Sequence, residues 1–115
     1  MGYDIRLEDE NGVVEVDSHM EGGVIAVGGS KEAYISITYN YSGYYHEYLD
    51  TKKGIRWLYG KKAKNTVKRL EKAVKILGTE QDDDYWNATE GNAGHCLNVL
   101  LGWAKRHPEA VWHGD

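Results

Sequence analysis

The spacing of apolar residues changes once along this chain, near Ser42 and Gly43, and this change constrains the fold more than any other feature. Before it, apolar and polar residues alternate, as they do in strands whose two faces meet different surroundings. After it, apolar residues recur every three or four positions, which is the spacing of one helix face. The order predicts an α+β fold in which a sheet comes first and helices follow.

The alternating part predicts four strands. Residues 3–8 and 13–17 flank Asn11-Gly12, a pair that tolerates positive φ and favours a hairpin. A short apolar run follows at 24–27, and residues 33–41 alternate again. We expect a four-stranded, mostly antiparallel sheet, because short turns join antiparallel neighbours.

The helical part predicts two main amphipathic helices, at 62–77 and 85–106, after a short helix around Tyr45 and a turn around Leu58. The first has an apolar stripe and ends at Gly78, a natural C-terminal cap. The second begins behind three aspartates at 82–84, whose charge suits a helix N-terminus, and it stops before Pro108. We expect both helices to pack on one face of the sheet, so that residues 1–115 form a single domain.

Charge is distributed very unevenly. Residues 52–75 hold ten of the fourteen lysines and arginines and one carboxylate, so this stretch has a net charge of +9, while the rest of the chain has −13. Such segregation favours a surface that faces an acidic or polyanionic partner. The plain alternative is a solvated helix face, because lysine is a good helix former.

Several classes of protein are disfavoured. No apolar run approaches the roughly 18 residues of a membrane span, and the first ten residues do not resemble a secretory signal. The single cysteine, Cys96, fits a reducing compartment, so we expect the cytoplasm. The five histidines show no metal-site spacing and no nucleophile motif is present, so we expect no metal, no cofactor and no catalysis. The best acid/base group would be His46 beside Glu47.

Two clusters of aromatic residues remain as candidates for binding. Residues 39–46 contain more rings than one strand edge can bury, and residues 56–62 interleave cations with aromatics, which suits stacking on a base while cations meet phosphate. For both clusters the alternative is packing of the rings into the core. The predicted ligand- or partner-binding residues are Tyr39, Asn40, Tyr41, Tyr44, Arg56, Trp57, Tyr59, Lys61, Lys62, Lys64, Lys68 and Trp86.

These features leave two functions open. The first is a small non-catalytic binding protein that blocks a host protein or nucleoprotein complex through its charge-polarised surface. The second is a small-ligand binder, a sponge that sequesters a nucleotide signal, in which Arg56 and Lys61 meet phosphate and rings and amides come from Tyr39, Asn40, Tyr41, Tyr59 and Trp86. Self-association is left open by the sequence, and neither function involves a membrane.

A set of short motifs also resembles a group of small uncharacterised proteins found in phages and bacterial mobile elements. The motifs are His19-Met20, Gly22-Gly23, Ala26-Val27-Gly28-Gly29, Thr38-Tyr39-Asn40-Tyr41, Lys53-Gly54-Ile55-Arg56, Tyr59-Gly60-Lys61, Tyr85-Trp86, Ala88-Thr89, Asn92-Ala93, Trp112 and Gly114-Asp115. The resemblance spans nearly the whole chain and carries no assigned activity. It implies an origin in a phage or mobile element and an intracellular role in the host, where proteins of this kind often act as counter-defence inhibitors.

Overall fold

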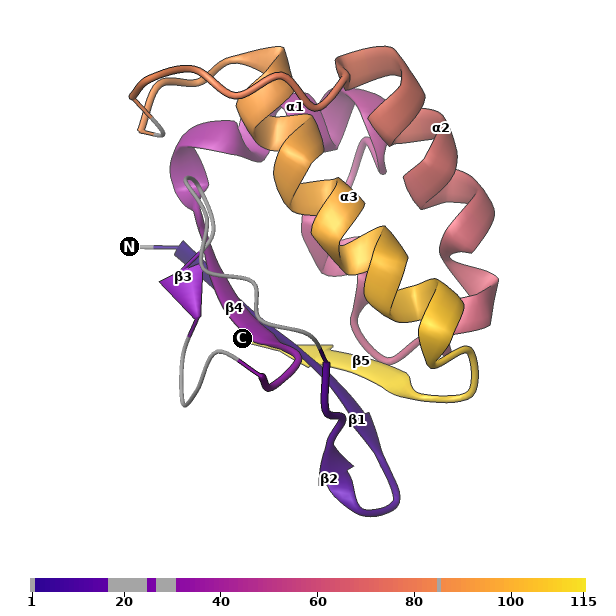
Figure 1. The fold of residues 1–115 in the computed structure, drawn as a ribbon. Coiled ribbons are helices and arrows are strands. Elements are labelled where there is room, and N and C mark those ends of the chain that lie inside the picture. Colours follow the sequence, from indigo (N-terminus) through magenta and orange to yellow (C-terminus); the bar gives the residue numbers. More distant parts are fainter. Residues whose placement is uncertain (1, 17–24, 27–30, 85) are drawn as a thin grey trace.

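Strand β1 (Gly2–Asp9) is the centre of the sheet in the computed structural model, which describes residues 2–16, 25–26, 31–84 and 86–115. β1 pairs antiparallel with β4 (Tyr34–Thr38) along one edge and with β5 (Val111–Gly114) along the other (Figure 1). Ile5 is therefore paired with a residue of each neighbour. Side chains of β1 alternate between buried and half-buried positions, which is the period that the sequence predicts.

The other two strands are very short. β2 (Gly12–Val13) turns back along β1, and β3 (Ile25–Ala26) pairs antiparallel with β4. The predicted α+β class, with a four-stranded antiparallel sheet from the first part of the chain and helices after it, is confirmed. The strand predicted at 13–17 is shorter than expected, although Glu15 still forms a bridge with Glu32. The expectations for residues 17, 24 and 27 lie outside the described residues.

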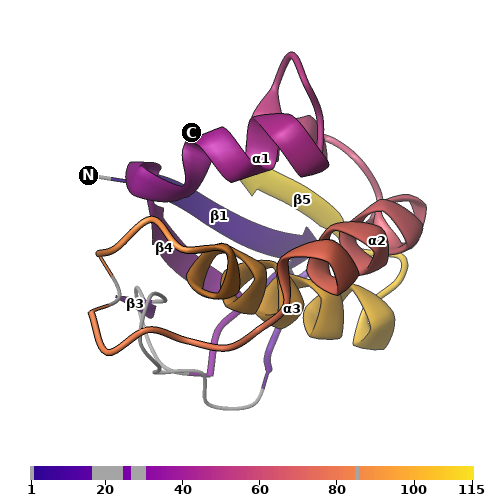
Figure 2. The same cartoon turned by 90° about the horizontal axis from the view of Figure 1, so that it is seen from above.

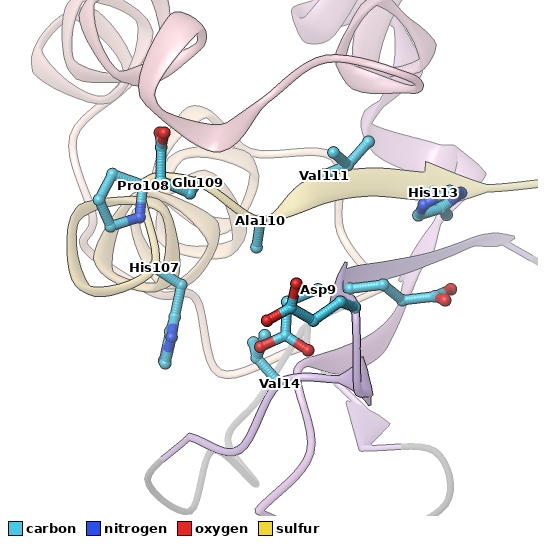
Figure 3. A pocket seen from close by; sticks show the side chains of 10 residues that line it. Asp9, Val14, His107, Pro108, Glu109, Ala110, Val111 and His113 are labelled. Carbon is cyan, nitrogen blue, oxygen red and sulfur yellow. The ribbon is translucent and has the colours of Figure 1, made fainter.

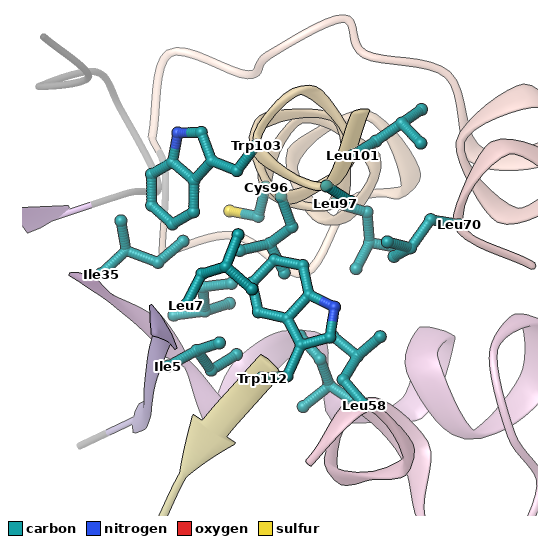
Figure 4. Close-up of a cluster of buried hydrophobic side chains, with 14 of the residues drawn as sticks. Ile5, Leu7, Ile35, Leu58, Leu70, Cys96, Leu97, Leu101, Trp103 and Trp112 are labelled. Atoms are coloured by element: carbon teal, nitrogen blue, oxygen red, sulfur yellow. The ribbon is translucent and has the colours of Figure 1, made fainter. Parts of the chain in front are cut away.

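A fifth strand comes from the end of the fold. The sequence predicts residues 109–115 only as a tail that is pinned to the core, whereas β5 pairs with β1 over four residues. Trp112 in this strand is fully buried, and Figure 4 shows its ring among Leu58, Leu97 and neighbouring core residues. Its indole N–H donates to the Thr66 hydroxyl at 3.0 Å, and that hydroxyl donates to the Ala63 carbonyl at 2.7 Å. Both polar groups of this buried pair are thus satisfied.

Helices follow the sheet and cover one of its faces (Figure 2). The predicted strand at 33–41 ends early, because residues 39–41 form the 3-10 helix η1 (Tyr39–Tyr41), which leads into α1 (Ser42–Tyr48). The 3-10 helices η2 (Gly54–Leu58) and η3 (Ala63–Asn65) come next. In the part of the chain that the structure describes, no helix has both the length and the apolar character needed to cross a membrane.

The two main helices, α2 (Val67–Leu77) and α3 (Glu90–Arg106), pack side by side. Gly78 ends α2 at a φ of 78°, as its position in the sequence predicts. α2 nevertheless starts later than residue 62, because the chain from Ala63 to Asn65 forms η3 first.

The predicted start of α3 at residue 85 is wrong. The helix begins at Glu90, and its N-cap is Thr89, whose side chain accepts a hydrogen bond from the Asn92 backbone N–H at 3.1 Å. The aspartates at 82–84 lie before this cap, in a segment that the Asn92 side chain holds: its Oδ1 accepts from the Asp82 N–H, and its Nδ2 donates to the Asp84 and Asn87 carbonyls. Aspartate side chains bond to nearby backbone groups there, which competes with a helix.

Candidate functional site

The basic segment runs over the surface from the turn before η2, through η3, and along α2, the outermost helix in Figure 1. Nine of its ten cations are exposed, and Lys61 is half-buried. We call the surface that these ten cations form the basic face; its residues are Lys52, Lys53, Arg56, Lys61, Lys62, Lys64, Lys68, Arg69, Lys72 and Lys75.

Few of these cations have a partner of opposite charge. Among the described residues, Lys62 and Lys64 pair with Glu109 at 3.9 and 3.0 Å, and Arg69 pairs with Asp50 at 3.3 Å. The hydrogen bond and charge of Lys64 lower the pKa of the Glu109 carboxyl. The six remaining lysines form no ion pair within the described part of the chain. The basic face is therefore a surface of uncompensated positive charge.

One group of contacts within the basic face is ordered around Trp57. The Lys61 ammonium lies 4.5 Å from the centre of the indole ring, and the Arg69 guanidinium lies 4.1 Å from it. Lys61 Nζ also donates to the Trp57 carbonyl at 2.7 Å. We call this group, together with Asp50 and Lys53, the Trp57 cluster. Cation–π contacts hold two positive charges on one half-buried ring.

Asp50 fixes the other side of the Trp57 cluster. Its Oδ2 accepts from the backbone N–H groups of Lys52 and Lys53 at 3.2 and 2.8 Å, while its Oδ1 accepts from Arg69. The hydrogen bond from the Lys53 backbone is the main reason why the pKa of the Asp50 carboxyl is lowered. The pKa of Lys61 is lowered too, first by desolvation and then by the neighbouring charges of Lys53 and Arg69. Like charges are thus crowded at this point.

The N-terminus of α2 adds to the positive potential. The N-cap residue, Thr66, makes no side-chain cap, because its hydroxyl is used by Ala63 and Trp112. The first turn contains no acidic residue and instead includes Lys68 and Arg69. Cations at the positive end of the helix dipole are unfavourable, by about 0.3–1 kcal/mol each at an exposed site. An anion bound nearby would relieve that cost.

Among the predicted site residues, Arg56, Lys61, Lys62, Lys64 and Lys68 belong to the basic face, and Trp57 lies within it. Arg56 also joins two other predicted residues in a second set of contacts: Tyr39 packs edge-on against Tyr3 at 4.8 Å, Arg56 lies over both of these rings, and Tyr59 packs against Gly114 of β5. The Tyr59 hydroxyl is buried and has no hydrogen-bond partner among the described residues, and burial raises its pKa well above the usual value.

The remaining predicted residues connect η1 and α1 to the segment before α3. The Asn40 amide donates to the Trp86 carbonyl at 2.8 Å, and the Tyr44 hydroxyl donates to the Ala88 carbonyl at 2.9 Å. Trp86 is 46% exposed. Tyr41 differs from the expectation of an accessible ring: it is fully buried and meets Tyr45 edge-on, so it belongs to the core.

Among the described residues, the predicted rings and cations thus belong to separate sets of contacts, and binding of a nucleotide between them stays a prediction. Sequence reasoning missed Asp50, Lys53 and Arg69 as members of the Trp57 cluster. No signal in the sequence marks Arg69, because the helix is predicted at 62–77, where Lys68 and Arg69 fall in the middle; the pair opposes the helix dipole only because α2 begins at Val67. No signal marks Asp50 or Lys53 either.

A hollow adjoins the basic face at Glu109, which pairs with Lys62 and Lys64. It has a volume of about 610 Å³ and lies between the hairpin of β1 and β2 and the turn from α3 into β5, where Figure 3 shows Asp9 and His107 on facing sides. Its acidic side chains are Glu8, Asp9, Glu10 and Glu109, of which Glu8 pairs with Arg6 and Glu109 with Lys64. Among the described residues, no group of three histidine, cysteine or acidic side chains is placed to hold a metal ion.

Comparison with protein-family models, with characterised proteins and with solved structures finds no match to this chain. The site is therefore interpreted from its own geometry and charge.

Proposed function

We propose that this protein is a non-catalytic binding protein whose basic face covers an acidic surface of a host protein or nucleoprotein complex. The observation that carries the proposal is the set of six exposed or half-buried lysines without an ion pair among the described residues. A face that served only solubility would do as well with both signs of charge interspersed, which avoids the repulsion among like charges. A partner of opposite charge removes this repulsion and is drawn to the face from a distance.

The resemblance to proteins of phages and mobile elements supports a host component as the partner, and a counter-defence inhibitor would act by masking such a surface. The exposed strip of α2 suits this task. Lys68, Lys72 and Lys75 lie on one side of the helix, and Ile76, which is 46% exposed, lies beside them. An apolar residue beside a set of cations gives an interface both electrostatic attraction and buried apolar surface.

The proposal is tested by retention of host proteins and nucleic acid from lysate on two matched variants. Lys68→Gln/Lys72→Gln removes two charges from the basic face, and Lys31→Gln/Lys105→Gln removes two exposed charges elsewhere. At low salt we expect the wild type and the second variant to retain the same partner. The first variant should bind it roughly 2- to 30-fold more weakly, since each exposed charge contributes about 0.2–1 kcal/mol. Equal retention by both variants, or no partner at any salt concentration, would refute the proposal.

A further inference from the structure

The Trp57 cluster holds its cations in place before any ligand arrives. Lys61 is fixed by the Trp57 carbonyl and ring, and Arg69 is fixed by the same ring and by Asp50. Lysine and arginine side chains on a surface normally lose considerable rotamer freedom when they bind a ligand. Here two cations from different elements already converge, so that loss is reduced and binding is favoured.

The charges of the Trp57 cluster are not balanced within it. Asp50 is its one carboxylate, and both oxygens are occupied, Oδ1 by Arg69 and Oδ2 by two backbone N–H groups. The ammonium groups of Lys53 and Lys61 form no ion pair among the described residues. Three cations therefore share one carboxylate, which leaves the cluster with an excess charge of about +2.

The chemistry of the cluster selects one kind of anion. A carboxylate is planar and is matched by one guanidinium fork, and the fork of Arg69 already faces Asp50. A phosphate carries several oxygens in a tetrahedral arrangement and can therefore meet several cations at once. Here the cations come from three segments: Lys53 from the turn before η2, Lys61 from the loop after η2, and Arg69 from α2. We propose that the Trp57 cluster binds a phosphate group, an inference that rests on the proposed function.

The same geometry indicates what the cluster does not recognise. Trp57 is half-buried and already carries Lys61 and Arg69 on its ring, so it offers no open platform on which a base could stack. Sequence-tolerant binding of single strands normally depends on such platforms, whereas phosphate contacts alone carry no base information. The phosphate is therefore held without reference to the base attached to it.

The test uses the isolated protein and inorganic phosphate at constant ionic strength, and it follows the indole N–H signal of Trp57 by NMR. Phosphate should shift this signal, and Lys61→Gln should weaken binding about tenfold, the effect of losing one charge-assisted hydrogen bond. Lys75→Gln, a change of the same charge on the far end of α2, should change it less than about twofold. Equal effects of the two variants, an unmoved Trp57 signal, or acetate binding as tightly as phosphate would overturn the proposal.

Two further binding measurements identify the source of the phosphate. Oligo-dT and oligo-dA of one length should bind equally if the group belongs to a nucleic-acid backbone, and only inorganic phosphate and mononucleotides should bind if it is free. A preference for one base would contradict the inference that the Trp57 cluster binds the phosphate whichever base is attached. Failure here is distinguishable from failure of the proposed function, because the partner is retained through Lys68 and Lys72, whereas phosphate binding depends on Lys61.

Discussion

Cys96 and Tyr45 are two ionisable side chains that the core holds in their neutral forms. Cys96 on α3 is fully buried, and burial raises the pKa of its thiol from 9.0 to about 12, an effect partly offset by a hydrogen bond with Tyr45. Burial likewise raises the pKa of Tyr45, whose hydroxyl donates to the Ala93 carbonyl at 3.0 Å. Both residues pack α1 and α3 together, and neither is placed for chemistry at neutral pH.

The raised pKa of Cys96 predicts a loss of stability in alkali. Well below pH 9 the thiol keeps its proton in both states; as the pH rises through 9 the unfolded chain releases it, while the folded protein keeps it up to about pH 12. The free energy of unfolding should therefore fall, by about 1 kcal/mol between roughly pH 8 and 10, as urea titrations would measure. In Cys96→Ala this part of the pH dependence should be absent. The same slope in both proteins, or rapid alkylation of native Cys96, would contradict the assignment.

The three glycines of α3 have different reasons to be there. A Cβ on Gly91 would lie 1.7 Å from the Glu80 carbonyl oxygen, and one on Gly94 would lie 1.8 Å from the Gly78 carbonyl oxygen. These two glycines let the connector from α2 cross the helix at backbone distance. A Cβ on Gly102 would meet nothing within 4 Å. Close packing accounts for the first two glycines and not for the third.

This difference predicts opposite effects of the same substitution at three positions of one helix. Gly102→Ala should stabilise the protein by about 1 kcal/mol, because alanine is the better helix former and the space is open. Gly91→Ala and Gly94→Ala should each destabilise it by about 1–3 kcal/mol, because the backbone of the connector must move. Thermal unfolding of the three variants checks this, and a loss of stability in Gly102→Ala would show that the helix is constrained there in another way.

The elements that the sequence predicts well are those whose period is visible locally. The alternation in β1 and the stripe of α2 show directly which side chains are buried. β5 was missed because four residues give no period, and its pairing with β1 joins the two ends of the fold. The start of α3 was misplaced because Asp82 and Asp84 cap local turns instead of a helix. In the site, the count of charges along the sequence located the basic face. It could not show that Lys61 and Arg69 meet on Trp57, because that contact depends on η3, which lies between these two residues in the chain.

At the scale of the whole molecule, the cations of the basic face are close enough to repel one another. The fold measures 35 × 27 × 22 Å, which is close to the Debye length of about 30 Å at roughly 10 mM salt, so charges across the basic face are only partly screened from one another there. The repulsion among them is stronger in the compact state than in an extended chain, because folding brings α2 beside η2 and η3. At about 0.15 M salt the Debye length is near 8 Å, and most of this repulsion is screened.

Stability should therefore rise with salt, and the two double variants should respond to charge removal with opposite signs. Lys68→Gln/Lys72→Gln relieves repulsion and removes a cation from the positive end of α2, so at low salt it should be up to about 1 kcal/mol more stable than the wild type. Lys31→Gln/Lys105→Gln takes cations from the acidic remainder and should be slightly less stable. Urea unfolding at low and at physiological salt measures both differences, which should shrink as salt is added. If the first variant were instead less stable at low salt, the lysines of α2 would be stabilising the fold, and their charge would need no partner to explain it.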